Sequence, residues 1–556
     1  MKANKFQLIA VAALALTLSA CGDQFLDRNP AGTSILEDQY AQLANNLEGS
    51  MRGIYSLQYT YSAHDEFGRR SIDMYSDLLS GDMALTNYNY GWFYTDEQRR
   101  SVSGRSSYLW SYYYYMLVNI NKVIYQVTQK STIVSDVAKY GLPNVGLNVL
   151  DSDGNILHTY TETEATMANY YAQALTMRGW CYYELVQFFN PTTAEILSAG
   201  YQLNQYASMP IYTETNMETA QPLSSVADVY TRLEADLETA IDYFDTFGLF
   251  FDRATKLEVD ADIARAILAY SFLNKANPNA ATSEPNKTYY QNAVTLCSQI
   301  GTLNTYYVLP AKELITNGFN NVNSVNWMWG QDVTVETATG LGSFFGQVDI
   351  HSYSYAWAGD TKAIDQILYD SIHVWDGRKY WFNPGVLNST FKLCPDGKFF
   401  SAKSPYSTAA DDIDREWLSD NVFMRYEMVL LVAAEASYRL QDYTSARNYL
   451  NMLTDERVSI FDATAAADYA SYQTNLSDAD LLKEIYYNWR VEMWGEGYGL
   501  QTFRRLGPSC EKDGKRRRGG NHSSDAGSEV EANDALHTFQ MPSSESTYNP
   551  AITENQ

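Results

Sequence analysis

The sequence has little cysteine, and its cysteines do not have the spacing of a metal site or a disulfide framework. Five Cys occur among 556 residues, far apart and without a C-x-x-C pair. This odd, scattered set argues against a zinc site and against a disulfide scaffold. Cys181 and Cys297 fall in apolar stretches with helical spacing, so we predict that both are packed thiols.

Catalytic signatures are also missing. The six His include no H-E-x-x-H pattern, and the chain has no G-x-S-x-G, no P-loop and no G-x-G-x-x-G before a helix. The paired carboxylates of a glycosidase remain open, because 66 acidic residues offer too many pairs. The sequence favours a protein that is not an enzyme, with no cofactor and no bound metal.

Positive charge is scarce. Against 66 Asp and Glu stand 40 Lys and Arg, which gives a net charge of −26. This charge argues against nucleic acid and against an anionic membrane surface as partners. A basic run, KRRR at 515–518, lies in a Gly- and Ser-rich stretch with acidic surroundings, and we interpret it as a solvated loop.

Beyond the N-terminus, no stretch is apolar enough to span a bilayer. Residues 1–20 combine a basic start with an apolar run from Leu8 to Leu18, which is typical of a secretory signal. The ending Leu18-Ser19-Ala20-Cys21 resembles a bacterial lipobox and makes Cys21 the predicted lipidation site. A multi-acyl anchor holds stably, since each buried methylene contributes about 0.8 kcal/mol. An ordinary signal peptide with a chance Cys is the alternative.

Aromatic residues are abundant, with 45 Tyr, 22 Phe and 11 Trp. Tyr and Trp combine an apolar face with a polar edge, which suits sugar or peptide binding, although most of them are expected in the core. In the polar stretch 71–98, Tyr88, Tyr90, Trp92 and Tyr94 alternate with other residues. The alternation fits either a short strand with one buried face or a loop that displays the rings.

Apolar spacing of three and four residues predicts a mostly α chain. The expected helices span 36–57, 107–127, 165–189, 225–244, 259–274 and 287–300. Ser225 can cap its helix together with Asp228. Between 303 and 419 the helical pattern is weak except near 363–371, while Trp327 and Trp329 alternate as in a buried strand.

Residues 421–457 predict two helices joined by a tight turn at Gln441-Asp442-Tyr443. A lone pair of this kind cannot bury its apolar face, so it implies stacked neighbours. The pair resembles a tetratricopeptide unit, with Gln441 where a turn Gly is usual. Ser477 can cap a further helix.

The stretch Asp151-Ser152-Asp153-Gly154-Asn155 looks like the start of a calcium loop, with Glu162 at the position of a bidentate carboxylate. Ile156 occupies the position that needs Gly, and no helix is expected before the stretch. A plain turn is the better interpretation.

The order of motifs along the chain resembles the SusD-like (RagB/SusD) family of surface lipoproteins. The resemblance begins with Arg425-Tyr426-Glu427 and Ala434-Glu435-Ala436 in the helix pair. Matching segments elsewhere are Phe25-Leu26-Asp27 after Cys21, Trp110, Tyr114 and Asn121 in one helix, Arg178-Gly179-Trp180, Met209-Pro210-Ile211, Asp376-Gly377-Arg378, the set Glu492, Glu496, Gly497, Arg505 and Gly507, and Asn549-Pro550 in the tail. The chain departs from the family at Asn488, Trp489, Gly499, Thr502 and Leu506, which weakens any ion pair carried over to these positions.

The resemblance implies a signal peptide at 1–20 and a single SusD-like domain at 21–556. Its fold would be mostly α, with tetratricopeptide-like helix pairs in a right-handed scaffold at 36–300 and 421–507. An irregular, aromatic-rich insertion at 303–420 would bind the ligand, and Asp376 and Arg378 would form a structural ion pair.

The implied function is a cell-surface glycan-binding lipoprotein of the outer membrane, lipid-anchored and facing the exterior. It would capture oligosaccharides and deliver them to a SusC-like TonB-dependent transporter. A peptide-capturing member of the same family is the alternative, and a glycan-degrading enzyme or an adhesin are further ones.

The resemblance places ligand contacts in the loop before the Trp110 helix and in the long insertion. Pyranose rings stack on Trp and Tyr faces, while polar side chains bind their hydroxyls. For each single aromatic, a place in the core is an equal alternative. The predicted ligand-binding residues are Tyr88, Tyr90, Trp92, Tyr353 and Trp357, with Asp82 and Asn89 as hydrogen-bonding partners.

Overall fold

The computed structural model describes residues 37–97, 102–250, 253, 255–301, 305–314, 319–351, 353–385, 389–399 and 419–552. The predicted signal peptide, Cys21 and the last four residues lie outside these ranges. Helices dominate the described residues, and the strands there form five short antiparallel pairs. The predicted mostly α fold is confirmed.

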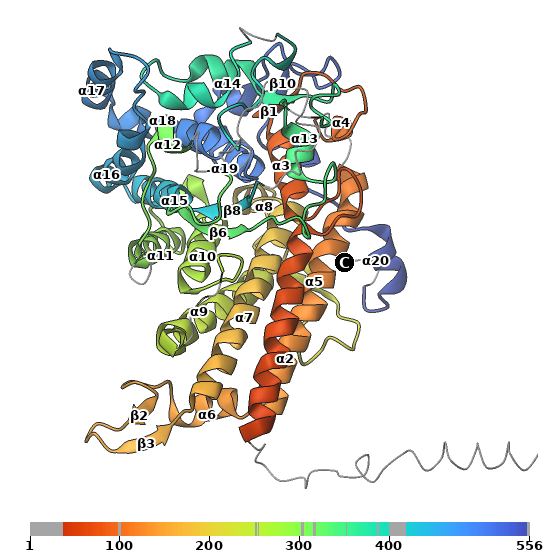
Figure 1. Ribbon diagram of the computed structural model, residues 1–556, viewed down its shortest axis with the longest axis vertical. Helices are drawn as coiled ribbons and strands as arrows, with labels where there is room; N and C mark the ends of the chain where they lie inside the picture. The colour runs from red at the N-terminus through yellow and green to blue at the C-terminus, as the bar shows by residue number, and fades with distance from the viewer. Residues whose placement is uncertain are drawn as a thin grey trace, which may run out of the picture.

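Three long helices form the body of the molecule and lie side by side in Figure 1. They are α2 (Glu37–Ser56), α5 (Val102–Lys130) and α7 (Glu162–Phe189). The next helix, α9 (Val226–Phe247), packs along α7. Gly179 of α7 permits this approach, since a Cβ there would lie 2.7 Å from Cγ of Leu237. The predicted capping box of Ser225 and Asp228 begins α9.

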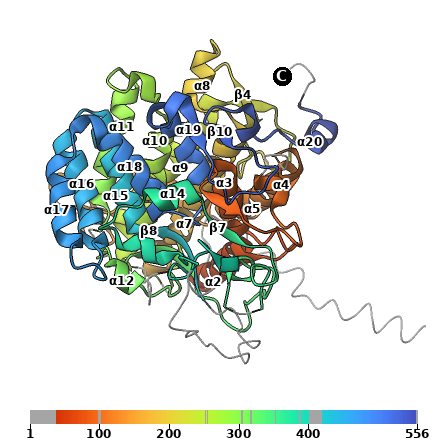
Figure 2. The same cartoon turned by 90° about the horizontal axis from the view of Figure 1, so that it is seen from above.

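A stack of shorter helices continues from this body. In the stack α10 packs on α11, α11 on α15, and α15 on both α16 and α18. Figure 2 shows α11, α15 and α16 along one side of the molecule and α4 and α5 on the other. The stacked helices are α10 (Ala261–Lys275), α11 (Asn286–Gln299), α15 (Tyr426–Arg439), α16 (Tyr443–Thr454), α17 (Ala465–Asn475) and α18 (Asp478–Glu492).

The predicted tetratricopeptide-like pair is confirmed as α15 and α16, although residues 421–425 precede it as a strand. The tight turn between the helices forms without glycine, because Gln441 itself adopts the left-handed backbone conformation, with a φ of 64°. Asp442 then caps α16 by accepting from the Ser445 backbone N–H at 3.0 Å. Ser477 caps α18, as predicted.

Strand pairs bring distant segments together. β6 (Trp327–Gln331) pairs with β8 (Asn421–Arg425), and both Trp327 and Trp329 are fully buried, which confirms their predicted place in the core. β1 (Met83–Leu85) pairs with β7 (Lys362–Ile364). The other pairs are β2 (Asn148–Leu150) with β3 (Ile156–Thr159), β4 (Ala207–Pro210) with β5 (Leu223–Ser225), and β9 (Lys515–Arg517) with β10 (Glu529–Glu531).

The segment that resembles a calcium loop is the turn of the β2–β3 hairpin. Asp151 accepts hydrogen bonds from the backbone N–H groups of Asp153 and Asn155 at 2.9 and 2.8 Å. This is an Asx turn. The favoured interpretation of a plain turn is therefore correct.

Residues 71–80, expected in an irregular polar stretch, belong to helix α3 (Arg69–Ser80), which packs on α19 (Gly499–Cys510). All twelve residues of α3 are buried. Ile72, Tyr75 and Leu79 form an apolar face at helical spacing, but the polar face opposite does not lie in solvent. Its polar side chains bond to the fold instead: Arg70 donates to Gly495 O at 2.9 Å. The remaining helices of four or more residues with regular α geometry are α4 (Tyr94–Glu97), α6 (Ile133–Tyr140), α8 (Thr193–Ser198), α13 (Phe344–Val348), α14 (Gln366–Ser371) and α20 (Ser543–Tyr548).

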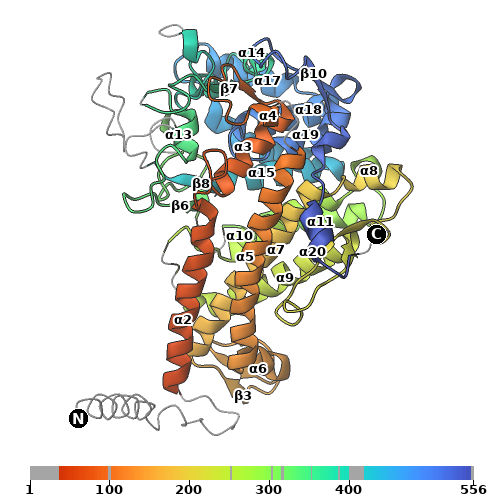
Figure 3. The ribbon, with the colours of Figure 1, turned by 90° about the vertical axis from the view of Figure 1, so that its right-hand side faces the viewer.

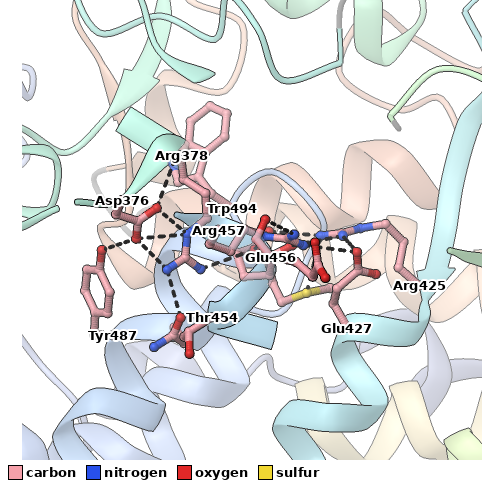
Figure 4. A network of polar contacts seen from close by, with 12 residues as sticks. Asp376, Arg378, Arg425, Glu427, Thr454, Glu456, Arg457, Tyr487 and Trp494 are labelled. Atoms are coloured by element: carbon pink, nitrogen blue, oxygen red, sulfur yellow. Dashed lines mark hydrogen bonds and ion pairs between the residues drawn. The ribbon is translucent and has the colours of Figure 1, made fainter. Parts of the chain in front are cut away.

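Ion pairs lie inside the molecule where the insertion meets the helix stack (Figure 4). Glu492 accepts from Arg378 at 3.2 Å, from Arg425 at 3.0 Å and from Arg457 at 2.8 Å, and all four side chains are fully buried. The predicted pair of Asp376 and Arg378 is confirmed at 2.6 Å. Because each charge has hydrogen-bonded partners of opposite sign, the burial of so many charges is tolerated.

The basic run at 515–518 is only partly solvated and is not a loop: Lys515 and Arg517 are accessible, but residues 515–517 form β9. Arg516 is 1% exposed and Arg518 is 6% exposed, while β9 and β10 form a hairpin there. Arg516 pairs with Asp82 at 2.9 Å. The interpretation as a solvated loop was wrong for Arg516 and Arg518, because their side chains bond buried acceptors far away in sequence.

Cys181 and Cys297 are buried free thiols, as predicted. None of the helices in the described ranges has both the length and the apolar character needed to cross a membrane.

Candidate ligand-binding site

Two aromatic loops emerge together from the β1–β7 pair. The first aromatic loop (residues 86–93) follows β1, and the second aromatic loop (residues 353–361) precedes β7. Because the two strands are antiparallel, the loops leave the same end of the pair. The Thr86 N–H donates to Thr361 O at 3.0 Å, and the Asn89 N–H donates to Gly359 O at 2.9 Å. The rings of Tyr88, Tyr90 and Trp92 therefore belong to a loop and not to a strand, and Tyr94 begins α4.

Asp360 fixes the first loop to the second. Its carboxylate accepts from the backbone N–H groups of Tyr90 at 2.8 Å, Gly91 at 3.1 Å and Trp92 at 2.9 Å. Asp360 itself is fully buried. Sequence reasoning missed this residue, because a single Asp in an irregular stretch carries no recognisable pattern.

The rings of the two loops meet at Tyr355. Its ring centroid lies 5.3 Å from that of Tyr90 and 5.8 Å from that of partly buried Trp92. The ring centroid of His64, in the segment after α2, lies 5.3 Å from that of Tyr355 and 5.1 Å from that of Trp92. Tyr355 and His64 were both missed as site residues, and no sequence pattern links His64 to the loops.

Several rings of this cluster face solvent. Exposed fractions are 55% for Tyr90, 50% for Tyr353, 53% for Trp357 and 45% for Tyr61. The rings of Tyr353 and Trp357 lie 5.7 Å apart, and Tyr61 lies 5.6 Å from His64. We call these four exposed rings (Tyr61, Tyr90, Tyr353 and Trp357), together with Tyr355, which is only 8% exposed, the aromatic surface.

Two other predicted residues lie at the margin of this surface. Tyr88 stacks on Tyr94 with centroids 4.5 Å apart and an angle of 25° between the rings. The exposed Asn89 side chain donates weakly to Ala358 O at 3.3 Å. Both side chains thus belong to the loop that carries Tyr90 and Trp92.

Asp82 does not reach the aromatic surface as an open hydrogen-bonding group. It is 2% exposed, and its Oδ1 bonds Arg490 at 2.8 Å and Arg516 at 2.9 Å. Two buried guanidinium groups need this carboxylate inside the fold. We therefore leave Asp82 out of the proposed site.

Behind the aromatic surface, Lys362, Gln347 and the backbone of His64 form a chain of hydrogen bonds. The Lys362 ammonium donates to Gln347 Oε1 at 2.7 Å, and Gln347 Nε2 donates to His64 O at 2.7 Å. Burial lowers the pKa of Lys362 to about 8. Within the described ranges, no three His, Cys, Asp or Glu side chains gather as a metal site would require. The arrangement offers ring faces for binding, while the carboxylate of Asp360 bonds loop backbone and that of Asp82 bonds two arginines.

A separate groove of about 480 Å³ lies between α5 and α20, and is lined by Trp110, Tyr114 and Tyr212 among others. Its rings mainly serve the fold: Trp110 donates to Glu545 at 3.1 Å, and Tyr114 donates to Pro210 O at 2.7 Å. Figure 3 shows α20 and α13 on opposite sides of the molecule, and Tyr355 of the aromatic surface bonds the backbone of α13. The groove is therefore distinct from the aromatic surface.

A helical repeat scaffold that presents clustered rings on loops defines a class of binding proteins. Residues 267–556 match the SusD family, and residues 143–268 match a family described as starch-binding associating with outer membrane. The first match covers more than half of the chain, and the chain belongs to the SusD family. Comparison with curated proteins finds no match.

Solved structures show the same fold. A SusD-like carbohydrate binding protein from Bacteroides vulgatus is similar with a TM-score of 0.66 and 21% identity, over 92% of this chain and 98% of that one. A SusD superfamily protein from Bacteroides thetaiotaomicron gives 0.66 and 18%, over 92% and 99%. One from Parabacteroides distasonis gives 0.56 and 15%, over 94% and 100%.

Proposed function

We propose that this protein is a glycan-binding lipoprotein that captures oligosaccharides on its aromatic surface and delivers them to a SusC-like TonB-dependent transporter. Membership in the SusD family supports a nutrient-binding role. The observation that carries the proposal is the cluster of exposed rings around Tyr355. Ring faces of this kind stack on the C–H patches of pyranoses.

The backbone of the first aromatic loop favours a glycan over a peptide. The N–H groups of Asn89, Tyr90, Gly91 and Trp92 already donate to Gly359 and Asp360. A captured peptide would need free backbone groups to bond its own main chain. Peptide capture remains the second candidate, since rings also bind peptide side chains.

We place the protein on the outer face of the outer membrane, held by a lipid on Cys21. The lipobox-like Leu18-Ser19-Ala20-Cys21 supports this anchor. Helix α2 begins sixteen positions after Cys21. We propose that the protein acts without catalysis and releases its ligand intact to the transporter.

The test is binding of the soluble chain 22–556 to a panel of neutral and acidic polysaccharides, oligosaccharides and peptides, by affinity electrophoresis and calorimetry. We expect one glycan class to bind, with affinity reduced at least about tenfold in Trp357→Ala and in Tyr90→Ala. Tyr548→Ala, an exposed tyrosine on α20, is the matched control and should bind normally. Binding of peptides alone would select the second candidate. Cleavage of a bound glycan would contradict the non-catalytic role.

A further inference from the structure

A third segment of the chain contacts the residues that follow each aromatic loop in sequence. Residues 518–525, which we call the brace, precede β10 in sequence. On one side the brace touches Glu97, the last residue of α4 after the first loop. On the other it touches Asp365, which follows β7 after the second loop.

His522 makes the central contacts of the brace. Its Nδ1 lies 2.9 Å from Oε1 of Glu97, and its Nε2 lies 3.1 Å from Oδ2 of Asp365. The His522 side chain is 3% exposed, and both carboxylates are fully buried. A neutral imidazole has only one N–H, so donation to both carboxylates requires the protonated ring.

Further hydrogen bonds tie the brace to the end of β7, the strand that follows the second loop. The Gly519 N–H donates to Asp365 Oδ2 at 2.5 Å, and Asn521 Nδ2 donates to Ile364 O at 2.9 Å. The Gln366 N–H donates back to Asn521 Oδ1 at 2.9 Å. This side of the brace is thus attached to the end of β7 and the start of α14.

The brace also reaches the first loop. The Ser523 hydroxyl donates to Glu97, whose Oε1 also accepts from the Leu85 N–H of β1 at 2.8 Å. Asp525 accepts from the Tyr94 hydroxyl at 2.7 Å, and Tyr94 stacks on Tyr88 of the loop. The brace therefore bonds the residues that follow the first loop. Through Glu97 it is linked to Leu85 before the loop, and through Tyr94 to the ring of Tyr88.

We propose that residues 518–525 fix the two aromatic loops relative to each other, and that protonated His522 is the positioning residue that holds them. Ligand affinity then depends on the charge of His522. This inference adds to the proposed function. Its effect on ligand affinity rests on that function, whereas its effect on the loops does not. His522 touches no ligand and acts only through Glu97 and Asp365.

The charges that face His522 come from three places. Glu97 lies on α4, Asp365 lies after β7, and Arg518 of the brace itself donates to Glu97 O at 3.2 Å. Burial alone would lower the pKa of His522, and Arg518 acts in the same direction. The hydrogen bonds to Asp365 and Glu97 outweigh both and raise the pKa above its usual value of about 6.5.

The direction of the pH effect follows from this balance. Because the pKa of His522 is raised in the folded protein, the brace is complete below about pH 6.5 and weakens as pH rises through the raised value. After deprotonation, one ring nitrogen faces a carboxylate without a proton between them, and two buried carboxylates lose their shared cation.

The first experiment measures amide hydrogen exchange of residues 89–92 in the chain 22–556 between about pH 6 and 9, corrected for intrinsic exchange rates. In the wild type we expect protection of these amides to fall about tenfold as His522 loses its proton. His522→Gln should show the low protection throughout, without the pH step. His373→Gln, which removes another His beside a carboxylate (Glu484, 3.3 Å), is the matched control and should behave as wild type.

Two further measurements keep the test decisive if His522→Gln folds poorly. NMR titration of the His522 ring in the wild type should give a pKa above its usual value. Asp525→Ala keeps His522 and should reduce protection of residues 89–92 by a smaller factor. Wild-type protection in His522→Gln, or titration of His522 at or below the usual value, would overturn the proposal.

The ligand arm uses the glycan selected from the panel. The affinity of the wild type for this glycan should fall as pH rises, over the same pH range as the amide protection. In His522→Gln the affinity should not show this change. If no panel member binds, the proposed function fails while the exchange experiment still decides on the brace. If the glycan binds with no pH step, the inference fails and the proposed function stands.

Discussion

The Asp360 carboxylate accepts a hydrogen bond from the backbone N–H of Trp92 at 2.9 Å, across 268 positions of sequence. It also binds the two preceding N–H groups, so one acidic side chain holds three consecutive amides. Consecutive amides form a natural anion-binding concavity. The aromatic surface thus depends on a contact that joins its two loops, and replacing Asp360 tests that dependence.

Asp360→Ala should weaken glycan binding at least about tenfold, because three buried or half-buried donors lose a charged acceptor and the first loop is released. The free energy of unfolding should fall by about 1–3 kcal/mol. Calorimetry with the glycan and urea denaturation measure the two effects. Asp370→Ala, an exposed change on α14, should leave both unaffected. Normal binding by Asp360→Ala would show that the loops hold their places without this carboxylate.

Glu492→Gln should destabilise the fold strongly at neutral pH. Burial alone would raise the pKa of Glu492, but Arg457, Arg425 and Arg378 hold it well below its usual range. Loss of the charge leaves three buried guanidinium groups short of a partner, at a cost of about 3–5 kcal/mol. Urea denaturation at pH 7 measures this, with exposed Glu529→Gln as the control.

The same variant gives a pH test with a defined sign. A carboxylate whose pKa is depressed in the folded state stabilises above its unfolded pKa and loses that contribution as pH falls through the folded value. The difference in unfolding free energy between wild type and Glu492→Gln should therefore be full above about pH 4.5 and narrow in acid. A difference that stays constant in acid would assign the effect to packing instead of charge.

Gly179→Ala should destabilise the contact between α7 and α9. The new Cβ would lie 2.7 Å from Leu237, so one helix must shift, at a cost of about 1–3 kcal/mol. Gly53→Ala in α2 is the matched change, because nothing lies within 4 Å of a Cβ there. It should stabilise by about 0.5–1 kcal/mol through helix propensity. Thermal unfolding of both variants measures the contrast, and equal shifts would contradict the close approach at Gly179.

The four cysteines of the chain 22–556 should behave as inert thiols. All four are free in the structure, and Cys181, Cys297 and Cys394 are buried. Burial raises the pKa of Cys394 and of Cys510 to about 12, so little reactive thiolate forms at neutral pH. A thiol reagent should label the native protein slowly and all four cysteines after unfolding. Reductant should leave the melting temperature unchanged, and a drop would reveal a disulfide.

Much of the scaffold was predictable from the sequence because helix formation leaves a local record. The helices near 36–57, 165–189 and 259–274 were recognised by apolar spacing, and Ser225 by its capping chemistry. The order of family motifs indicated the SusD fold. The α3 helix was not predicted, although Ile72, Tyr75 and Leu79 have helical spacing, because it is short and adjoins a polar, Gly-containing stretch, and its buried polar side chains have distant partners.

The sequence also indicated which two regions hold the displayed rings, since aromatics gather among Gly, Asn and Ser there. Contact of Tyr88, Tyr90, Trp92, Tyr353 and Trp357 with a ligand remains a prediction. The sequence by itself determined the helical scaffold and the candidate loops, and it predicts an export signal. These depend on residues that are near one another along the chain.

Only the tertiary structure decided how the loops meet. It placed Tyr355 between Tyr90 and Trp92, used Asp360 as an anchor, and took Asp82 into the core beside Arg490 and Arg516. The physical reason is that each of these contacts joins residues hundreds of positions apart. Their partners are selected by strand pairing and by the need of every buried charge for an opposite one, and neither leaves a local pattern.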